Sequence, residues 1–478
     1  MVTLSTFQQR RNRLRALLPE GLVVLGGHRP QPMNIPMNVT RLRQSSHLLF
    51  LTGLRAPDVA LLFRLDTGRL ELFLPPQEAG DDIWHGRSPS ADEIGDEIGA
   101  DAAYPLAELE ARIASHRADR DPPLFTVPSA DPEWAARLEA IGIQVPRFGA
   151  LDRYVPSPLA DALVTLRLSQ DAAGLEAMRA AAAVTAEAHR VAMAATRPGG
   201  HEAQIRALIE GVFRASGMAL AYDPIVTIRG EVLHCWSNPH RLSDSDLLLV
   251  DAGCETPGGY AADVTRTWPV RGRFDGRQRA VYEIVLEAQM QCIDLVRPGV
   301  EYVDIHLHAA RVIAQGLKDL GLLRGSIDDL VANDTHALFF PHGVGHLIGL
   351  DVHDIEDLGD RAGYGADRQR SPRFGMAYLR LNRRLEPGMA VTIEPGIYFI
   401  PGLLENPNVI ARHRPWVDFD KARSYLGFGG IRIEDDVVVT LEAPEVLSAG
   451  IPKTVAEIEA CVGSAPELLG ALGRYQPA

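Results

Sequence analysis

The chain has 478 residues and a formal net charge of −14, with 46% hydrophobic and 23% charged residues. This length exceeds what one hydrophobic core usually supports, so we expect two globular domains. The acidic balance argues against a nucleic-acid-binding protein, because phosphate binding needs a basic surface.

The cysteines and the N-terminus bear on the cellular compartment. The four cysteines are widely spaced and form no CxxC pair, which fits a reducing cytosol better than a disulfide framework. The arginine-containing N-terminus lacks an apolar core that ends in a cleavage site, so it does not resemble a signal peptide. No apolar run approaches the length of a transmembrane span. We expect a cytoplasmic protein that does not associate with membranes.

The first third of the chain has the pattern of a small mixed α/β domain. Short apolar runs, which we interpret as strands, alternate with polar helical stretches: "GLVVLGG", "HLLFLTG" and "VALLFRL". A proline-containing segment follows, and then a long alanine-rich helix with Ser169 as its N-cap and "RPGG" as its end. We place the boundary near residue 160, which gives domains 1–160 and 161–478.

The second domain also mixes helices and strands. Residues 276–297 and 302–320 have helical patterns. Four stretches rich in β-branched residues predict strands: "SDLLLVDAG", "TRTWPV", "MAVTIEPGIYF" and "GIRIEDDVVVT". Acidic side chains fall on or beside these strands, and they carry the functional argument.

Four carboxylates stand out because each has both an ordinary and a functional explanation. Asp251 ends one strand and Asp263 opens the next, across a glycine-rich turn. A single aspartate there is usually a turn residue, but two facing acids repel each other unless a cation lies between them. Glu394 and Glu434 interrupt apolar strands, which favours pairing or metal coordination; taken singly, either could be a strand-edge glutamate facing water.

The stretch "PHGVGHLIGLDVHD" adds three histidines: His342, His346 and His353. It is not a helical HExxH zinc motif, because Gly343 stands where the glutamate is needed. Four carboxylates with one imidazole suit Mn²⁺, and suit Zn²⁺ or Co²⁺ less specifically. Two ions about 3.5–4 Å apart, sharing carboxylates and a hydroxide, would use all four acids.

The order Asp, Asp, His, Glu, Glu in these motifs resembles the dinuclear metallopeptidases of the pita-bread fold, which include methionine aminopeptidase, aminopeptidase P and prolidase. The resemblance covers roughly residues 166 to 465. "LRQSSHLLFLTG" and "DDIWHGR" also resemble the N-terminal domain of the proline-specific members. The resemblance implies a small mixed α/β N-terminal domain followed by a pita-bread catalytic domain, and small peptide substrates with proline in second position.

The resemblance also implies roles for individual residues. The implied ligands of two divalent metal ions are Asp251, Asp263, His346, Glu394 and Glu434. Glu394 would also accept a proton, His353 would stabilise the tetrahedral intermediate, and His234 would lie on the substrate side. His342 would support the site. Arg432 would orient the carboxylates, unless it is an ordinary surface arginine.

Two proline-specific branches share this ligand set. "YLRLNRRLEPGM" resembles the prolidase stretch in which an arginine binds the dipeptide carboxylate, and Arg380 matches it; otherwise Arg380, Arg383 and Arg384 form a solvated basic turn. The long segment between the two glutamates is also prolidase-like. We therefore expect an Xaa-Pro dipeptidase that uses a hydroxide between two metal ions, with aminopeptidase P acting on longer peptides as the alternative.

Other expectations are less direct. The turn between Asp251 and Asp263 is one residue longer than the common family spacing, and Tyr222 is a candidate substrate contact. A homodimer is implied by the resemblance, with Trp84 capping the partner's active site; otherwise Trp84 is a domain-core aromatic. A metal-free pita-bread binding protein is the non-enzymatic alternative, but it predicts a broken ligand set, and all five positions are intact here.

Overall fold

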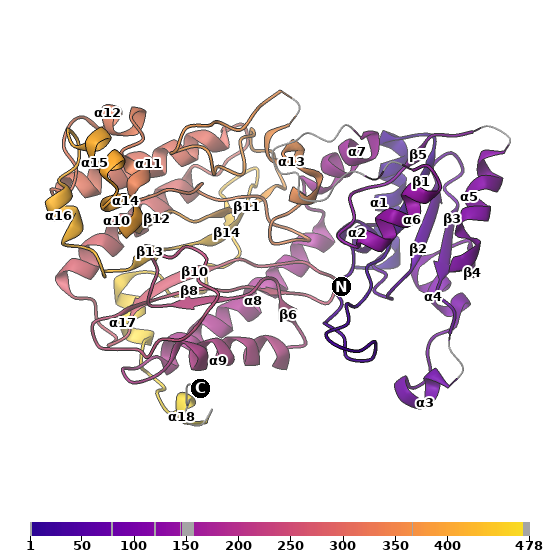
Figure 1. The fold of residues 1–478 in the computed structure, drawn as a ribbon, viewed down its shortest axis with the longest axis horizontal. Coiled ribbons are helices and arrows are strands. Elements are labelled where there is room, and N and C mark those ends of the chain that lie inside the picture. The colour runs from indigo at the N-terminus through magenta and orange to yellow at the C-terminus, as the bar shows by residue number, and fades with distance from the viewer. Residues whose placement is uncertain are drawn as a thin grey trace. The chain divides into compact units, whose positions relative to one another are not determined.

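The computed structural model describes residues 2–77, 80–118, 121–143, 145, 157–365 and 367–471. The chain forms two compact units (Figure 1). Unit 1 comprises Met1–Leu168 and Ile355–Ala362, and unit 2 comprises Ser169–Asp354 and Gly363–Ala478. The expected boundary near residue 160 falls inside a helix of unit 1, and it stays a prediction. Residues 151–156 of the proline-containing segment lie outside the described residues.

A five-stranded sheet forms the centre of unit 1. The strand order is β4-β3-β2-β1-β5, with parallel pairing at both edges and antiparallel pairing between β1, β2 and β3. The strands are β1 (Leu22–Gly26), β2 (Ala60–Arg64), β3 (Leu70–Leu74), β4 (Ala102–Pro105) and β5 (Leu124–Phe125). The helices are α1 (Leu4–Leu17), α2 (Ser46–Thr52), α3 (Asp81–His85), α4 (Ala91–Ile98), α5 (Leu109–Arg117), α6 (Pro132–Ala140) and α7 (Pro158–Arg167), with a 3-10 turn at Leu106–Glu108.

Strand alternation gives unit 1 two apolar layers. Leu22 and Val24 on β1 pack in one cluster with residues of α5 and α6. Val23 and Leu25 point to the opposite face, where they line a small hollow with Leu51 of α2. Both faces of the sheet are therefore covered, which explains why its strands are almost continuously apolar.

The run "HLLFLTG" is a helix and not the predicted strand. It forms α2, which ends at Gly53 in the left-handed conformation with a φ of 72°. Every residue from His47 to Thr52 is buried, so the helix has no polar face and no visible period. A short apolar run of this kind cannot be assigned from periodicity alone.

A buried carboxylate links β3 to α5 in unit 1. Glu71 is fully buried, and its Oε1 accepts hydrogen bonds from Arg112 (2.6 Å) and Arg69 (3.0 Å). Its Oε2 lies 3.2 Å from Nε2 of His116. Burial alone would raise the pKa of Glu71, but hydrogen bonds from the two arginines and His116 outweigh it and lower the pKa.

This lowered pKa predicts a pH dependence for the stability of unit 1. Because the pKa is lower in the folded than in the unfolded chain (about 4.3), Glu71 stabilises unit 1 above that pH and loses this contribution as the pH falls through the folded pKa. Glu71→Gln should lower the free energy of opening of β2 and β3 by about 1.5 kcal/mol at neutral pH, because both arginines are partly exposed.

Hydrogen exchange of the β2 and β3 amides measures this effect, and the difference from the unmodified protein should shrink as the pH falls below about 4. The matched control is Glu133→Gln, which removes an exposed pair with Arg29 and should change little. A difference that persists unchanged to acid pH would contradict the assignment.

Unit 2 consists of short sheets flanked by two pairs of long helices (Figure 1). α8 (Ala172–Ala195) packs on α9 (Glu202–Ala215), and α10 (Gly276–Asp294) packs on α11 (Tyr302–Asp319). The first pair contacts β6, β7 and β9, and α10 contacts β11, β12 and β13. The helices at 276–294 and 302–319 agree closely with the sequence pattern.

The remaining elements of unit 2 are short. The strands are β6 (Ala219–Leu220), β7 (Ile225–Thr227), β8 (Leu247–Asp251), β9 (Cys254–Glu255), β10 (Thr265–Pro269), β11 (Ala390–Ile393), β12 (Gly396–Tyr398), β13 (Gly430–Arg432), β14 (Asp435–Val438) and β15 (Glu445–Val446). The helices are α12 (Ile327–Ala332), α14 (Pro401–Leu404), α15 (Pro407–His413), α16 (Phe419–Arg423), α17 (Val455–Cys461) and α18 (Leu468–Ala471), with a 3-10 turn at His336–Leu338. The 3-10 turn at Glu356–Leu358 belongs to unit 1, and α13 (Arg361–Tyr364) begins in unit 1 and ends in unit 2.

The two strands that carry glutamates are broken at those glutamates. β12 pairs with β13 and β11 pairs with β14, both antiparallel, so the four strands form one long hairpin interrupted on both arms. Glu394 lies at the break in one arm, before Pro395, which has no N–H to donate to a ladder. Glu434 lies at the break in the other arm. The sequence predicted continuous strands here, and the structure corrects this.

The start of α8 also differs from the expectation. Its N-cap is Asp171, whose side chain accepts a hydrogen bond from the Gly174 backbone N–H. Ser169, the predicted cap, instead donates its hydroxyl to the Pro387 carbonyl at 2.9 Å. Among the described residues, no helix combines the length and the hydropathy needed to cross a membrane.

Candidate active site

The five predicted metal ligands come from three neighbouring parts of unit 2. Asp251 is the last residue of β8 and pairs with Thr265 of β10, two residues after Asp263. Glu434 donates its backbone N–H to the Thr265 carbonyl at 3.0 Å, which joins the long hairpin to β10. These backbone contacts bring acids from distant positions in the sequence to one place.

His346 is attached to the same hairpin. Its backbone N–H donates to Thr392 Oγ1 at 3.1 Å, and its carbonyl accepts from the Thr392 N–H at 2.9 Å. Gly345 has a φ of 156°, and a Cβ there would collide with the Thr392 carbonyl oxygen and the Tyr302 hydroxyl. The glycine before His346 is therefore required for this close approach.

Three of the predicted ligands form a compact buried group. Asp263, His346 and Glu434 each offer a ligand atom, and these atoms lie within 4.8 Å of one another. Nε2 of His346 is 3.3 Å from Oδ2 of Asp263 and 3.9 Å from Oε1 of Glu394. Nδ1 of His346 lies 2.9 Å from the Leu347 carbonyl, which can only accept, so Nδ1 carries a proton and Nε2 is the nitrogen that faces the carboxylates.

Asp251 is held by two long side chains. Nη2 of Arg432 donates to Asp251 Oδ2 at 2.6 Å, and the Tyr222 hydroxyl lies 2.7 Å from Asp251 Oδ1 and 2.6 Å from Asp263 Oδ1. Arg432 also donates to Tyr398 (3.0 Å) and to Thr265 (3.0 Å). Arg432 is only 4% exposed, so the surface-arginine alternative is wrong.

This cluster carries more negative than positive charge. Burial, and then the like charges of the neighbouring acids, raise the pKa of Glu434 well above its usual value. Burial raises the pKa of Glu394 to about 7 and also raises that of Asp251. For Asp263, burial is outweighed by the contact with His346, so its pKa is lowered. An oxygen-rich donor set with excess negative charge and one imidazole fits divalent cations.

The other two histidines of the "PHGVGHLIGLDVHD" stretch, His342 and His353, lie beside predicted ligands. Nε2 of His342 is 2.8 Å from the Tyr398 hydroxyl, and Nδ1 is 3.7 Å from Oε2 of Glu394. Burial and the charge of Arg432 lower the pKa of His342 to about 3, so it is neutral. The ring of His353 stacks on His346 with centroids 4.0 Å apart.

His234 and Arg380 lie near the same charges. His234 is exposed, in a turn and not in a strand. Partial burial and the positive charges of Arg432 and Arg380 lower its pKa, against the opposing charge of Asp251. Arg380 is half-buried, whereas Arg384 is exposed and pairs with Glu301. The solvated-turn alternative therefore describes Arg384 and not Arg380.

Trp84 belongs to α3 of unit 1. Its side chain is 75% exposed, so the alternative that it is a domain-core aromatic is wrong. Its expected role at a partner's active site stays a prediction.

Sequence reasoning missed several supporting residues. Tyr222 was considered only as a substrate contact, but its hydroxyl lies between Asp251 and Asp263. Thr265 donates its hydroxyl to Glu434 Oε2 at 2.6 Å. Thr265 follows Asp263 by two positions, so strand alternation could have placed both on one face. For Tyr398 we find no comparable sequence signal.

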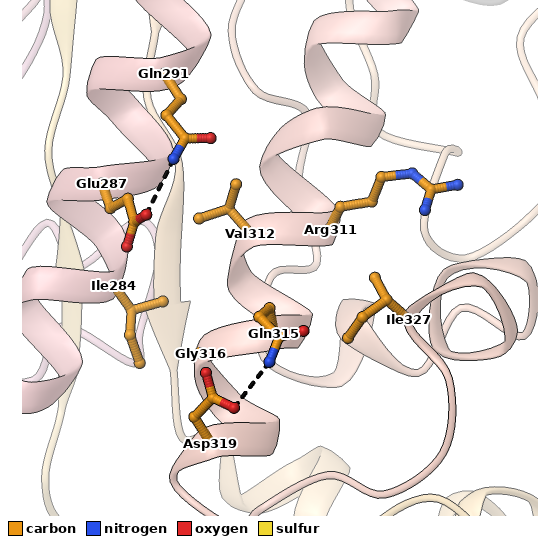
Figure 2. Close-up of a pocket in the computed structure, with 9 residues that line it drawn as sticks. All are labelled: Ile284, Glu287, Gln291, Arg311, Val312, Gln315, Gly316, Asp319 and Ile327. Carbon is orange, nitrogen blue, oxygen red and sulfur yellow. Dashed lines mark hydrogen bonds between the residues drawn. The ribbon is translucent and has the colours of Figure 1, made fainter.

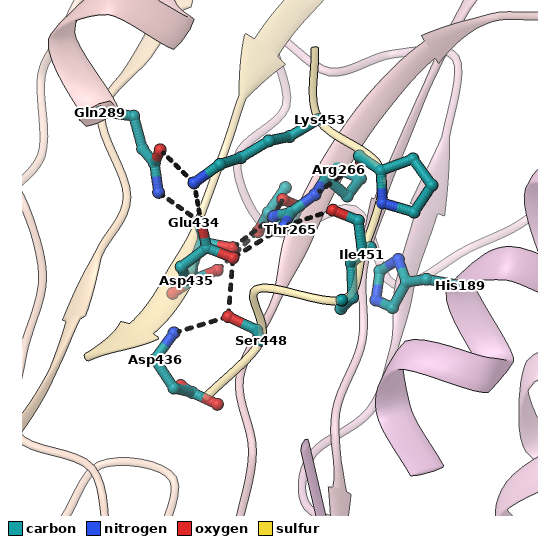
Figure 3. Close-up of polar contacts among 12 residues, drawn as sticks. His189, Thr265, Arg266, Gln289, Glu434, Asp435, Asp436, Ser448, Ile451 and Lys453 are labelled. Carbon is teal, nitrogen blue, oxygen red and sulfur yellow. Dashed lines mark hydrogen bonds and ion pairs between the residues drawn. The ribbon is translucent and has the colours of Figure 1, made fainter. Parts of the chain in front are cut away.

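A second, largely buried polar network supports the back of Glu434 (Figure 3). Arg266 and Asp435 are both completely buried and pair at 2.7 Å. Arg266 also donates to the Glu434 carbonyl at 2.6 Å, and Asp435 accepts from Gln289, Ser448 and Lys453. Burial would raise the pKa of Asp435, but the charges of Arg266 and Lys453 outweigh it and lower the pKa to about 2. The network fixes the backbone that presents Glu434.

A separate hollow of about 430 Å³ lies between α10, α11 and α12 (Figure 2). Its polar groups largely satisfy one another along the helices: Gln291 donates to Glu287 at 3.0 Å, and Gln315 donates to Asp319 at 2.8 Å. None of the predicted site residues lines it.

The buried acids and imidazole define a metal-dependent hydrolytic enzyme, and comparison with known proteins agrees. Residues 176–441 match the model of metallopeptidase family M24, and residues 7–125 match that of the aminopeptidase P N-terminal domain. The chain therefore belongs to metallopeptidase family M24.

Individual relatives match along almost the full length. The Xaa-Pro aminopeptidase of Escherichia coli strain K12 is 32% identical over 471 residues, which covers 96% of this chain and 98% of that protein. A probable Xaa-Pro aminopeptidase of Emericella nidulans is 32% identical over 463 residues, covering 92% and 94%. The structure of Pseudomonas aeruginosa aminopeptidase PepP is 34% identical with a TM-score of 0.79, covering 97% and 99%.

These matches confirm the predicted family, the pita-bread fold behind a mixed α/β N-terminal domain, and the metallopeptidase class. They do not favour the predicted branch. The relatives named above are aminopeptidases, and the N-terminal model is that of aminopeptidase P. The alternative, an Xaa-Pro aminopeptidase, is thus better supported than the dipeptidase.

The contacts of Arg432 generate a prediction. Lysine keeps the charge but cannot reach Asp251, Tyr398 and Thr265 together. Because residues that orient metal ligands typically contribute about 10–100-fold to metal affinity, Arg432→Lys should weaken metal binding by about that factor, as measured by chelator competition. Arg412→Lys, at an exposed position, is the control. Unchanged metal affinity in Arg432→Lys would show that the arginine does not orient Asp251.

Proposed function

We propose that this chain is an Xaa-Pro aminopeptidase, which removes the N-terminal residue from peptides with proline in second position. The observation that carries the proposal is the buried Asp263, His346 and Glu434 group, set in a chain that is similar over almost its whole length to Xaa-Pro aminopeptidases. The aminopeptidase P-type N-terminal domain supports the same branch.

The proposed cofactor is a pair of divalent ions held by Asp251, Asp263, His346, Glu394 and Glu434. Manganese suits this oxygen-rich set with a single imidazole, and zinc or cobalt suit it less specifically. Such ions, when bound, lower the pKa of water toward about 7 and polarise a carbonyl. Burial, and then the negative charges of the neighbouring acids, raise the pKa of Glu434, which supports a cationic occupant.

The chain's own side chains would then divide the remaining work. Glu394 accepts the proton of the attacking water and returns it to the leaving proline nitrogen. His353, stacked on His346, donates a hydrogen bond to the carbonyl oxygen as negative charge develops on it. His234 contacts the substrate, and the neutral His342 holds Tyr398, which in turn accepts from Arg432.

A dipeptidase is the second candidate, favoured by Arg380. Its positive charge contributes to the lowered pKa of His234, which supports a position on the substrate side, and a guanidinium suits a free carboxylate. We also propose a homodimer, in which the exposed Trp84 contacts the partner.

A substrate panel separates the two branches. The unmodified protein should cleave Xaa-Pro tripeptides and longer peptides with a higher kcat/KM than Xaa-Pro dipeptides, measured by release of the N-terminal residue. Arg380→Ala should then affect all substrates alike, with Arg384→Ala as the control.

The opposite pattern would overturn the aminopeptidase assignment. That pattern is faster cleavage of dipeptides, together with a loss of about tenfold to hundredfold in Arg380→Ala confined to substrates with a free carboxylate beside proline. It would assign the chain to the dipeptidase branch.

A further inference from the structure

The loop that carries His234 is anchored at its two ends to one buried side chain. The loop follows β7, begins at Ile228 and returns at His240. His234 lies in its middle, next to Trp236, which is 68% exposed and stacks parallel to His234 with centroids 6.5 Å apart. The middle of the loop is thus open to solvent, and its position depends on how its ends are held.

The anchor is Glu202, the first residue of α9. Its Oε1 accepts the backbone N–H of Ile228 at 2.7 Å, and its Oε2 accepts the backbone N–H of His240 at 3.0 Å. The Glu202 backbone N–H donates to the His240 carbonyl at 3.1 Å. One carboxylate therefore joins the loop's beginning to its end.

Glu202 is fully buried, which makes this arrangement informative. A buried carboxylate is costly unless it is hydrogen-bonded. Besides the two N–H groups, Glu202 has Nδ1 of His240 at 3.0 Å from Oε2. All of these partners belong to the two ends of the loop. The hydrogen bonds that compensate the burial of Glu202 are therefore the same bonds that hold the loop.

Two further contacts hold the loop, one near each end. Nδ2 of Asn238 donates to the Val226 carbonyl at 2.7 Å. A Cβ on Gly230 would lie 2.7 Å from the carbonyl oxygen of Gly430, the first residue of β13, two positions before Arg432. The first part of the loop therefore packs against the strand that carries Arg432, and its last part is bonded to β7. His234, between them, is close enough to Arg432 and Asp251 to feel their charges.

We propose that Glu202 is a positioning residue for peptide hydrolysis, which holds the Ile228–His240 loop so that His234 faces the substrate. This inference rests on the proposed function, in which His234 contacts the substrate. The hydrogen bonds of the Glu202 side chain go to Ile228 and His240, so it acts through the loop.

The first test measures the loop itself. Glu202→Gln keeps the size of the side chain, but its NH₂ faces one of the two loop N–H groups, so only one of the two side-chain bonds to the loop remains. Hydrogen exchange in the amides of residues 228–240 should become faster in this variant, while exchange in α10 and α11 stays unchanged. Exchange in the loop that matches the unmodified protein would overturn the anchor.

The second test separates positioning from stability. Glu202→Gln should retain its metal content and lose up to about a hundredfold in kcat/KM for an Xaa-Pro peptide, because displacing a substrate-side group by about 1 Å can have an effect of this size. The matched control is Ile209→Val, a fully buried change on the same helix, which loses stability but should keep kcat and KM.

A double-mutant cycle with His234→Ala completes the design. If Glu202 acts through His234, Glu202→Gln should have little further effect in the His234→Ala background. Fully additive losses would overturn the proposal, as would a loss in Ile209→Val equal to that in Glu202→Gln. Failure of the proposed function is distinct: the unmodified protein would then cleave no Xaa-Pro peptide, while the exchange measurement would still decide whether Glu202 holds the loop.

Discussion

Four acidic side chains lie close together in unit 2, with Asp263 and Glu434 buried and Asp251 and Glu394 partly buried, and the site depends on what compensates their charge. Burial raises the pKa of Glu394 and of Glu434, with neighbouring acids adding to the effect. The protein supplies one cation directly, Arg432 on Asp251, and one imidazole, His346. The remaining negative charge is the physical reason to expect divalent ions, because buried like charges are otherwise stable only when protonated.

The fold brings these acids together through backbone pairing. The two arms of the long hairpin break at Glu394 and Glu434, which turns both side chains out of the regular ladders. Thr265, the first residue of β10, joins this hairpin to β8, because it pairs with Asp251 and its carbonyl accepts the Glu434 N–H. Arg266, paired with the buried Asp435, donates to the Glu434 carbonyl. The backbone of Glu434 is thus held by Arg266, and its carboxylate by the Thr265 hydroxyl.

The sequence was most informative where chemistry and local period coincide. Two long helices, at 276–294 and 302–319, could be predicted because their apolar residues recur with a helical period. The strand that ends at Asp251 could be predicted because an apolar run stops at an acid. "HLLFLTG" could not, because a helix buried on every side has no polar face to reveal it. The contacts of Glu202 and Tyr222 also could not be predicted, since each joins segments that only tertiary folding brings together.

The branch of the family was a different kind of problem. The ligand set is common to both proline-specific branches, so the choice depended on Arg380 and on segment lengths, which do not report substrate length directly. The relatives and the N-terminal domain favour the aminopeptidase. The choice of branch does not change the metal site, which depends on the acidic side chains and His346.

The most direct test of that account is the metal content of the purified protein, determined by elemental analysis together with peptidase activity before and after chelation. We predict two divalent ions per chain, loss of activity when they are removed, and recovery when manganese is restored. Cleavage of Xaa-Pro peptides at the full rate by a metal-free protein would contradict the assignment of a metal site.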